Sequence, residues 1–87
     1  MVGMLAVSRA GHDRDVLYLI VREEGERVYL ADGVHRTYAA PKKKNRRHIQ
    51  TVRSGISPEL MEELSENPAD ADTKIKRWIK LYQKQNV

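Results

Sequence analysis

The sequence predicts a small, mainly β domain in which five short strands close into a barrel, followed by two short helices. Short apolar or alternating runs separated by turn residues fill the first half of the 87-residue chain. After residue 57 the apolar residues recur at the helical period instead. A chain of this length forms one small core. We therefore expect a barrel over residues 1–55 and a helical extension over residues 56–87 that packs on it.

Each predicted strand is bounded by a turn signal. The strands are expected over residues 4–8, 17–22, 28–31, 34–39 and 48–52. Gly25 is the expected positive-φ residue of a hairpin turn, so the second and third strands pair antiparallel. Asp32-Gly33 marks the next turn, and Pro41 ends the fourth strand.

The helical half contains two helix starts. Ser57-Pro58 combines a capping hydroxyl with proline at the first helical position, and Asn67-Pro68 repeats the signal. An apolar stripe at helical spacing then follows, made of Ile75, Trp78, Ile79 and Tyr82. The favoured interpretation is that this stripe packs on the barrel or the first helix. The alternatives are that it docks a partner, or that the basic face of the helix extends a nucleic-acid footprint.

Charge is sorted into blocks along the chain. Lys and Arg number 16 and Asp and Glu number 12, which gives a formal charge of +4. Residues 33–55 carry bases and no acid, whereas residues 56–72 carry acids and no base. Residues 42–47, called the basic run below, hold five bases in six positions. Such a run binds phosphates, whose counterions are released on binding, or it remains a solvated flexible loop.

Other classes of function lack their signals. The absence of cysteine excludes disulfides and thiolate zinc sites and is compatible with a reducing compartment. The first apolar run is too short for a signal peptide or a membrane span, so we expect a cytoplasmic protein. The spacing of His12, His35 and His48 matches no metal motif. No nucleophile motif or phosphate loop occurs, and we expect no enzyme activity and no cofactor.

Residues 3–13, followed by the apolar run 17–21, resemble the KOW motif: a strand, a loop with a fixed glycine, and a second strand. The likeness covers about residues 2–52 and is strongest to bacterial relatives of an archaeal and eukaryotic large-subunit ribosomal protein family. The shared features are Ala10-Gly11, the Asp32-Gly33 turn, and a basic stretch over residues 41–50. Where that family often closes the first loop with Lys-Gly, this chain has Arg14-Asp15. The resemblance implies an SH3-like barrel that binds RNA without catalysis, at or near the ribosome.

The expected RNA contacts combine the first loop with the basic stretch. They are Arg9, Gly11, His12, Arg14, Lys42, Lys43, Lys44, Arg46, Arg47, His48 and Arg53. Gly11 is either a turn residue or a place where a nucleic-acid backbone approaches closely. The strand tyrosines 18, 29 and 38 are expected to pack in the core rather than to stack on bases.

A second hypothesis is a protein–protein module. KOW domains of the NusG transcription-factor type touch proteins as well as nucleic acid. In that case Trp78 and Tyr82 of the last helix would dock a ribosomal or transcription protein. Under both hypotheses we expect a monomer that has structured or ribosomal RNA, or such a protein, as its partner, and no membrane contact.

Overall fold

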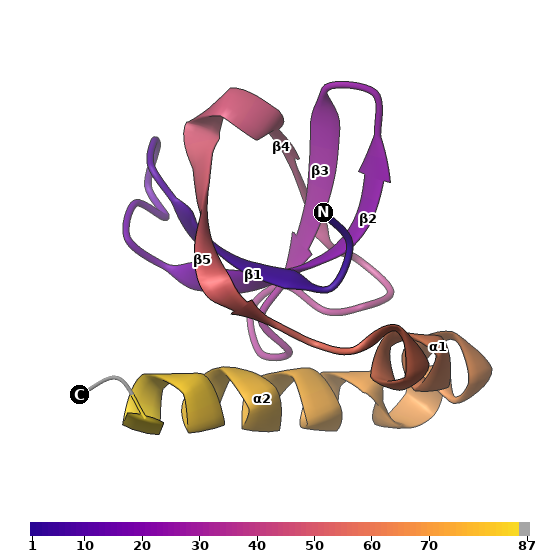
Figure 1. Ribbon diagram of the computed structural model, residues 1–87. Coiled ribbons are helices and arrows are strands. Elements are labelled where there is room, and N and C mark those ends of the chain that lie inside the picture. Colours follow the sequence, from indigo (N-terminus) through magenta and orange to yellow (C-terminus); the bar gives the residue numbers. More distant parts are fainter. Residues whose placement is uncertain (86–87) are drawn as a thin grey trace.

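The computed structural model describes residues 1–85, which form a curled five-stranded antiparallel sheet with two helices on one side (Figure 1). The strands are β1 (Met4–Ser8), β2 (Leu17–Glu24), β3 (Arg27–Ala31), β4 (Lys42–Asn45) and β5 (Ile49–Gly55). Their order across the sheet is β4-β3-β2-β1-β5. A single 3₁₀ turn, η1 (Arg46–His48), joins β4 and β5, the two edge strands.

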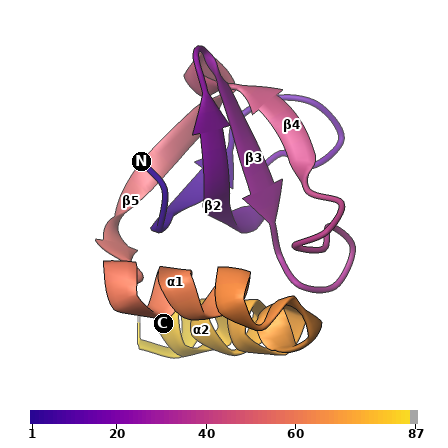
Figure 2. The same ribbon diagram turned by 90° about the vertical axis from the view of Figure 1, so that its right-hand side faces the viewer.

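Of the two predicted helix starts, Ser57-Pro58 opens the first helix, whereas Asn67-Pro68 opens a 3₁₀ turn without a side-chain cap and the second helix begins at Ala71. α1 (Pro58–Glu66) starts after Ser57, whose side chain accepts a hydrogen bond from the Leu60 amide at 3.3 Å. A 3₁₀ turn, η2 (Pro68–Asp70), leads into α2 (Ala71–Gln85). The turned view shows both helices below the sheet, side by side (Figure 2). Residues 86 and 87 of the predicted extension lie outside the described residues.

The sheet carries an apolar core on each face. Because side chains alternate along a strand, one face of β1, β2 and β3 lines the inside of the curl and the other faces the helices. The inner core contains Ala6, Tyr18, Ile20, Val28 and Leu30. The outer core joins Leu5, Leu19 and Ala31 of the strands to Leu64, Ala71, Ile75 and Ile79 of the helices. Each large side chain fully buried there contributes about 1.5–3 kcal/mol, so the helices are part of the folded unit.

The predicted strand at residues 34–39 is wrong: this segment is a loop. One carboxylate oxygen of Asp32 accepts the backbone N–H groups of Val34, His35 and Arg36 at 2.8–2.9 Å. The carboxylate of Asp72, at the start of α2, accepts the backbone N–H of Tyr38 at 2.7 Å. These donors are therefore satisfied by side chains, and a strand ladder is not needed to satisfy them.

The fourth strand is instead made by the first part of the basic run. Lys42–Asn45 pairs antiparallel with Arg27–Ala31, although lysine is a poor strand former. The fifth strand is confirmed but shifted, because His48 belongs to η1 and the strand continues to Gly55. The basic run is therefore a strand and a turn rather than a flexible loop.

The turn at Gly33 sets how closely the loop approaches α2. Gly33 has φ +82°, and a Cβ there would overlap the Asp72 carbonyl oxygen. Gly33→Ala is expected to lower the free energy of unfolding by about 3 kcal/mol, measured by urea denaturation. Gly25→Ala is the matched control: φ is +59° and nothing lies within 4 Å, so a loss of about 1 kcal/mol is expected. Equal losses in the two variants would contradict the close packing of the loop on α2.

Candidate nucleic-acid interface

Strand β4 turns its lysines to opposite sides of the sheet. Lys42 lies opposite Leu30 and Lys44 opposite Val28, and both of these partners belong to the inner core. Lys43 lies opposite Tyr29 on the outer face and is exposed. The period of two therefore divides three consecutive lysines into two that point into the curl and one that faces solvent.

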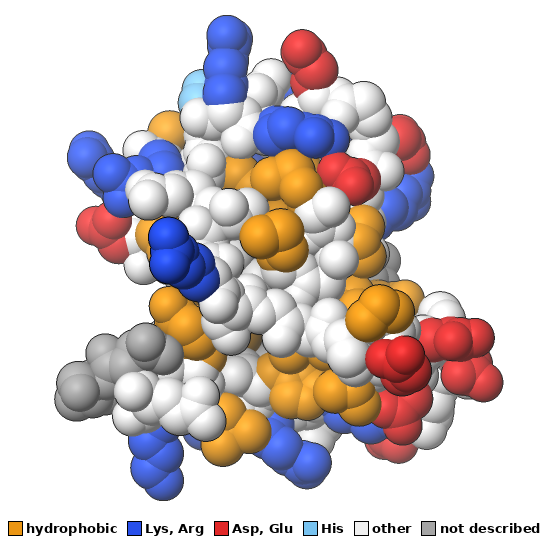
Figure 3. Space-filling model, viewed as in Figure 1, with side chains coloured by type: hydrophobic (Ala, Val, Ile, Leu, Met, Phe, Trp, Pro, Cys, Tyr) orange, Lys and Arg blue, Asp and Glu red, His pale blue; other side chains and the backbone are white. Residues whose placement is uncertain are grey.

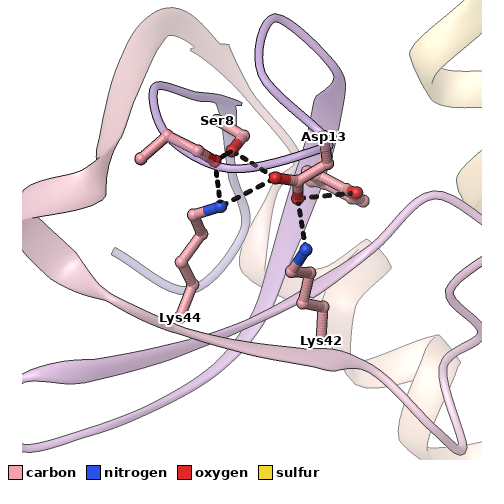
Figure 4. A network of polar contacts seen from close by, with 6 residues as sticks. Ser8, Asp13, Lys42 and Lys44 are labelled. Atoms are coloured by element: carbon pink, nitrogen blue, oxygen red, sulfur yellow. Dashed lines mark hydrogen bonds and ion pairs between the residues drawn. The ribbon is translucent and has the colours of Figure 1, made fainter.

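The two inward lysines meet the carboxylate of Asp13, which comes from the loop between β1 and β2 (Figure 4). The Lys44 ammonium lies 2.8 Å from Oδ1 and the Lys42 ammonium 2.9 Å from Oδ2. The hydroxyl of Ser8 donates to Oδ1 at 2.9 Å and that of Tyr18 donates to Oδ2 at 3.0 Å. We call these five residues the Asp13 cluster. Each carboxylate oxygen thus receives one ammonium and one hydroxyl donor.

This environment favours the ionised carboxylate. The Asp13 side chain is only 11 % exposed. Burial tends to raise its pKa, but the hydrogen bonds from the two lysines and the two hydroxyls outweigh burial. They hold the pKa well below its ordinary value of 3.8. Burial and the hydrogen bond to Asp13 raise the pKa of Tyr18 to about 12, so its hydroxyl stays a donor. The cluster is therefore an internal ion-pair network in which two of the predicted RNA contacts, Lys42 and Lys44, share one carboxylate, so the network keeps one net positive charge.

A second group of predicted residues lies together on the surface. Arg9, His12 and Arg14 are exposed on the β1–β2 loop, and Arg47 and His48 are exposed on η1. The backbone N–H of Arg9 donates to the carbonyl of His48 at 2.8 Å, which joins the two segments. The orientation of η1 is fixed by Asn45, whose side chain accepts the Arg47 amide at 3.0 Å. We call these five residues the loop-end surface.

The remaining predicted contacts are dispersed. Arg46 binds the carboxylate of Glu23 at 2.8 Å and the carbonyl of Gly25 at 2.8 Å, so its guanidinium is partly engaged. Arg53 is exposed further along β5. Gly11 has φ +84°, and a Cβ there would meet only ordinary contacts, so the conformation of the turn is sufficient to explain the glycine.

The tyrosines are used within the fold. Tyr18 is 3 % exposed, which confirms core packing for this residue. Tyr38 packs against the outer core. Tyr29 is half-buried and carries the Arg22 guanidinium over its ring, with the guanidinium carbon 4.6 Å from the ring centre. The Arg22 guanidinium therefore covers one face of the Tyr29 ring.

The helical stripe is also used internally. Ile75 and Ile79 are buried in the outer core, and Trp78 and Tyr82 are partly buried against it. The last helix therefore packs on the outer face of the sheet. Docking of a partner through Trp78 and Tyr82 stays a prediction.

Acids and bases occupy different parts of the surface. Acidic side chains gather over α1, and Lys and Arg gather over the part of the molecule that carries the β1–β2 loop (Figure 3). α1 supplies exposed acids at positions 59, 62, 63 and 66. A polyanion is therefore attracted to the loop-end surface and repelled from α1.

Sequence reasoning missed the Asp13 cluster. In the sequence pattern Asp13 is only the neighbour of His12 in a loop, and Ser8 is only the last residue of a predicted strand. The available signal was the alternation at Lys42 and Lys44, which becomes informative once that segment is assigned to a strand opposite the apolar Val28 and Leu30.

The chain matches no model of a known protein family, and a search of curated proteins also finds no match. Among residues 1–85, no helix is long and apolar enough to cross a membrane. Within the same residues, no group of three His, Asp or Glu side chains is placed to hold a metal ion. The three histidines are all exposed on separate segments.

Lys44 and Lys43 provide a matched pair for testing the cluster. Lys44→Met leaves a buried carboxylate without one of its ammonium partners, so the free energy of unfolding should fall by about 2 kcal/mol. Lys43→Met removes the same charge from the exposed side of the strand and should change the free energy of unfolding by about 0.5 kcal/mol or less. Chemical denaturation measures both. A Lys43 variant as unstable as the Lys44 variant would contradict the alternation of β4.

The cluster also predicts a pH dependence. The folded pKa of Asp13 is depressed, so its contribution to stability is present above the unfolded value of 3.8 and is lost as the pH falls below it. Asp13→Asn should be about 2 kcal/mol less stable than the parent protein at neutral pH. This difference should narrow progressively below about pH 5, as measured by denaturation at a series of pH values. A difference that stays constant down to about pH 2 would show that Asp13 is not the titrating group.

Proposed function

We propose that this protein binds structured RNA through the loop-end surface, without catalysis, as an SH3-like barrel of the KOW type that works in translation in the cytoplasm. The observation that carries the proposal is the hydrogen bond from the Arg9 amide to the His48 carbonyl. It places Arg9 beside Arg47 and His48, which are remote in sequence. Among residues 1–85, no ion pair engages any member of the loop-end surface, so its charge is available to an external anion.

The chemistry of these side chains suits a phosphate backbone. Each arginine can donate two parallel hydrogen bonds to one phosphate, and each phosphate neutralised releases a counterion. The loop-end surface contains no Tyr, Trp or Phe, and Tyr18 and Tyr38 are packed in the fold. Recognition by backbone and shape, rather than by base stacking, is therefore favoured.

The loop conformation supports the resemblance to KOW proteins. Asp15 stands where that family often has glycine, and it adopts φ +72°, a conformation that glycine takes without steric cost. Aspartate is among the few other residues that tolerate this region. Arg14-Asp15 thus keeps the cation and the turn of the family's Lys-Gly, but Asp15 adds an acid that Lys-Gly lacks.

The structure changes the set of residues proposed to contact RNA. Lys42 and Lys44 act within the Asp13 cluster and hold the β1–β2 loop against β4, while Arg46 is tied to Glu23. Direct contacts are assigned to Arg9, Arg14 and Arg47, with His12 and His48 as additional donors. The lysines position that loop and do not touch the RNA.

The test is a salt titration of binding to purified ribosomal RNA. The variant Arg9→Ala/Arg47→Ala should bind more weakly. The slope of its log affinity against log salt concentration should be smaller in magnitude by about two. Both side chains are exposed, so the variant should unfold at the same denaturant concentration as the parent.

The control variant Arg22→Ala/Arg36→Ala removes the same net charge from other parts of the surface and should retain the parental slope. Equal effects of the two variants would mean that only net charge matters. Absence of binding by the parent protein at low salt would refute the proposed function.

A further inference from the structure

The outward face of α2 carries a row of cations that the proposed RNA contact does not use. Lys76, Arg77, Lys80 and Lys84 are exposed; Arg77, Lys80 and Lys84 lie on the side of the helix away from the buried Ile75 and Ile79, and Lys76 lies at the flank. No acid follows Asp72 in this helix. Among residues 1–85 no ion pair engages these four side chains, whereas the neighbouring Lys74 reaches Glu63 of α1 at 4.0 Å.

These charges repel one another. Lys76, Lys80 and Lys84 follow at intervals of four residues, so neighbours lie about 6 Å apart along the helix axis. Like charges at this spacing destabilise a helix. Among the described residues no ion pair relieves this repulsion, and the helix is ordered because its opposite face is buried in the outer core. An external polyanion would relieve it.

An anionic membrane is a poor occupant of this face. Helices that bind membrane surfaces insert an apolar face between the lipids. The apolar face of α2 is already buried against the sheet, and Leu81 is the one large apolar side chain exposed along the helix.

A second copy of this chain is also a poor occupant, although the acids of α1 would complement the cations of α2. Exposed ion pairs contribute little to stability, and a stable dimer needs an extensive interface with an apolar centre. On the helices, only Leu60 and Leu81 are large exposed apolar residues among those described. A nucleic-acid backbone needs no apolar surface, because counterion release drives its binding.

The α2 face is separated from the loop-end surface. Both views place η1 at the end of the molecule away from the helices (Figures 1 and 2). A shallow groove of about 510 Å³ lies between the base of the β1–β2 loop and α2, and it is lined by Asp15 and Asp32 on the side of the sheet and by Lys76 and Lys80 on the side of α2. These acids interrupt the positive charge, so the two basic surfaces form two contacts rather than one continuous track.

We infer that the cations of α2 bind the backbone of a second RNA segment, so that one protein molecule bridges two segments of a folded RNA. This inference rests on the proposed function and adds a second site to it. It explains why a domain of this size carries two basic surfaces with a groove containing Asp15 and Asp32 between them.

The experiment uses an RNA hairpin labelled with a fluorescent donor and the same hairpin labelled with an acceptor. The full-length protein, mixed with both, should bring two hairpins together and produce energy transfer that disappears at high salt. Lys76→Ala/Lys80→Ala/Lys84→Ala should bind one hairpin with near-parental affinity and lose the energy transfer. The affinity of this α2 variant for a second hairpin should fall at least about tenfold. Arg9→Ala/Arg47→Ala should also lose the energy transfer, because it weakens binding of a hairpin to the loop-end surface.

Each other outcome overturns the inference in a recognisable way. A parent protein that saturates with one hairpin per molecule refutes bridging while leaving RNA binding intact. Binding of no hairpin refutes the proposed function itself. If sedimentation shows a dimer that the α2 variant converts to a monomer, the α2 face is a contact between copies. Alanine favours helix, so circular dichroism of the α2 variant should match the parent.

Discussion

The ion pairs and hydrogen bonds of the Asp13 carboxylate are the interactions on which the arrangement of the curled sheet depends. The carboxylate ties the β1–β2 loop to the edge strand β4 through Lys42 and Lys44, and to the ends of β1 and β2 through Ser8 and Tyr18. Two ammonium groups facing the inner apolar core are tolerable only because a charge of opposite sign lies between them. The loop in turn carries Arg9 and Arg14, so an internal ion pair determines where the external charges are displayed.

The lysine-rich strand has a second consequence for the sheet. β4 is an edge strand, and edges expose unpaired backbone groups that can recruit another chain. Here the edge is short, carries Lys43 on its outer side, and passes directly into η1. The same residues therefore close the inner core and discourage pairing of the edge with a neighbour, two tasks that are independent of RNA.

Local patterns predicted the parts of the fold that local physics determines. The first three strands and the start of α1 follow from apolar periodicity and from the capping residue Ser57, whereas α2 begins three residues after the predicted proline, behind η2. The fourth strand could not be predicted, because lysines have low strand propensity and because residues 34–39 contain the more favourable composition. Residues 34–39 form a loop instead of a strand because of a long-range contact, the hydrogen bond from the Tyr38 amide to the Asp72 carboxylate. The sequence singled out the two segments of the candidate site, but their bases could not be sorted into internal and external groups without the register of β4 against β3.

The contact between Tyr38 and Asp72 also bears on how the chain acquires its structure. Asp72 follows Tyr38 by 34 residues, and it supplies the acceptor that fixes the loop leading into β4. A nascent chain emerging from its N-terminus can pair β1, β2 and β3 early, because their connections are short. The lysine strand lacks its anchor until α2 has begun to form. We therefore expect β4 to pair with β3, and so complete the sheet, only after the helices have been synthesised. A chain without the helices would present the apolar outer face of its sheet to chaperones.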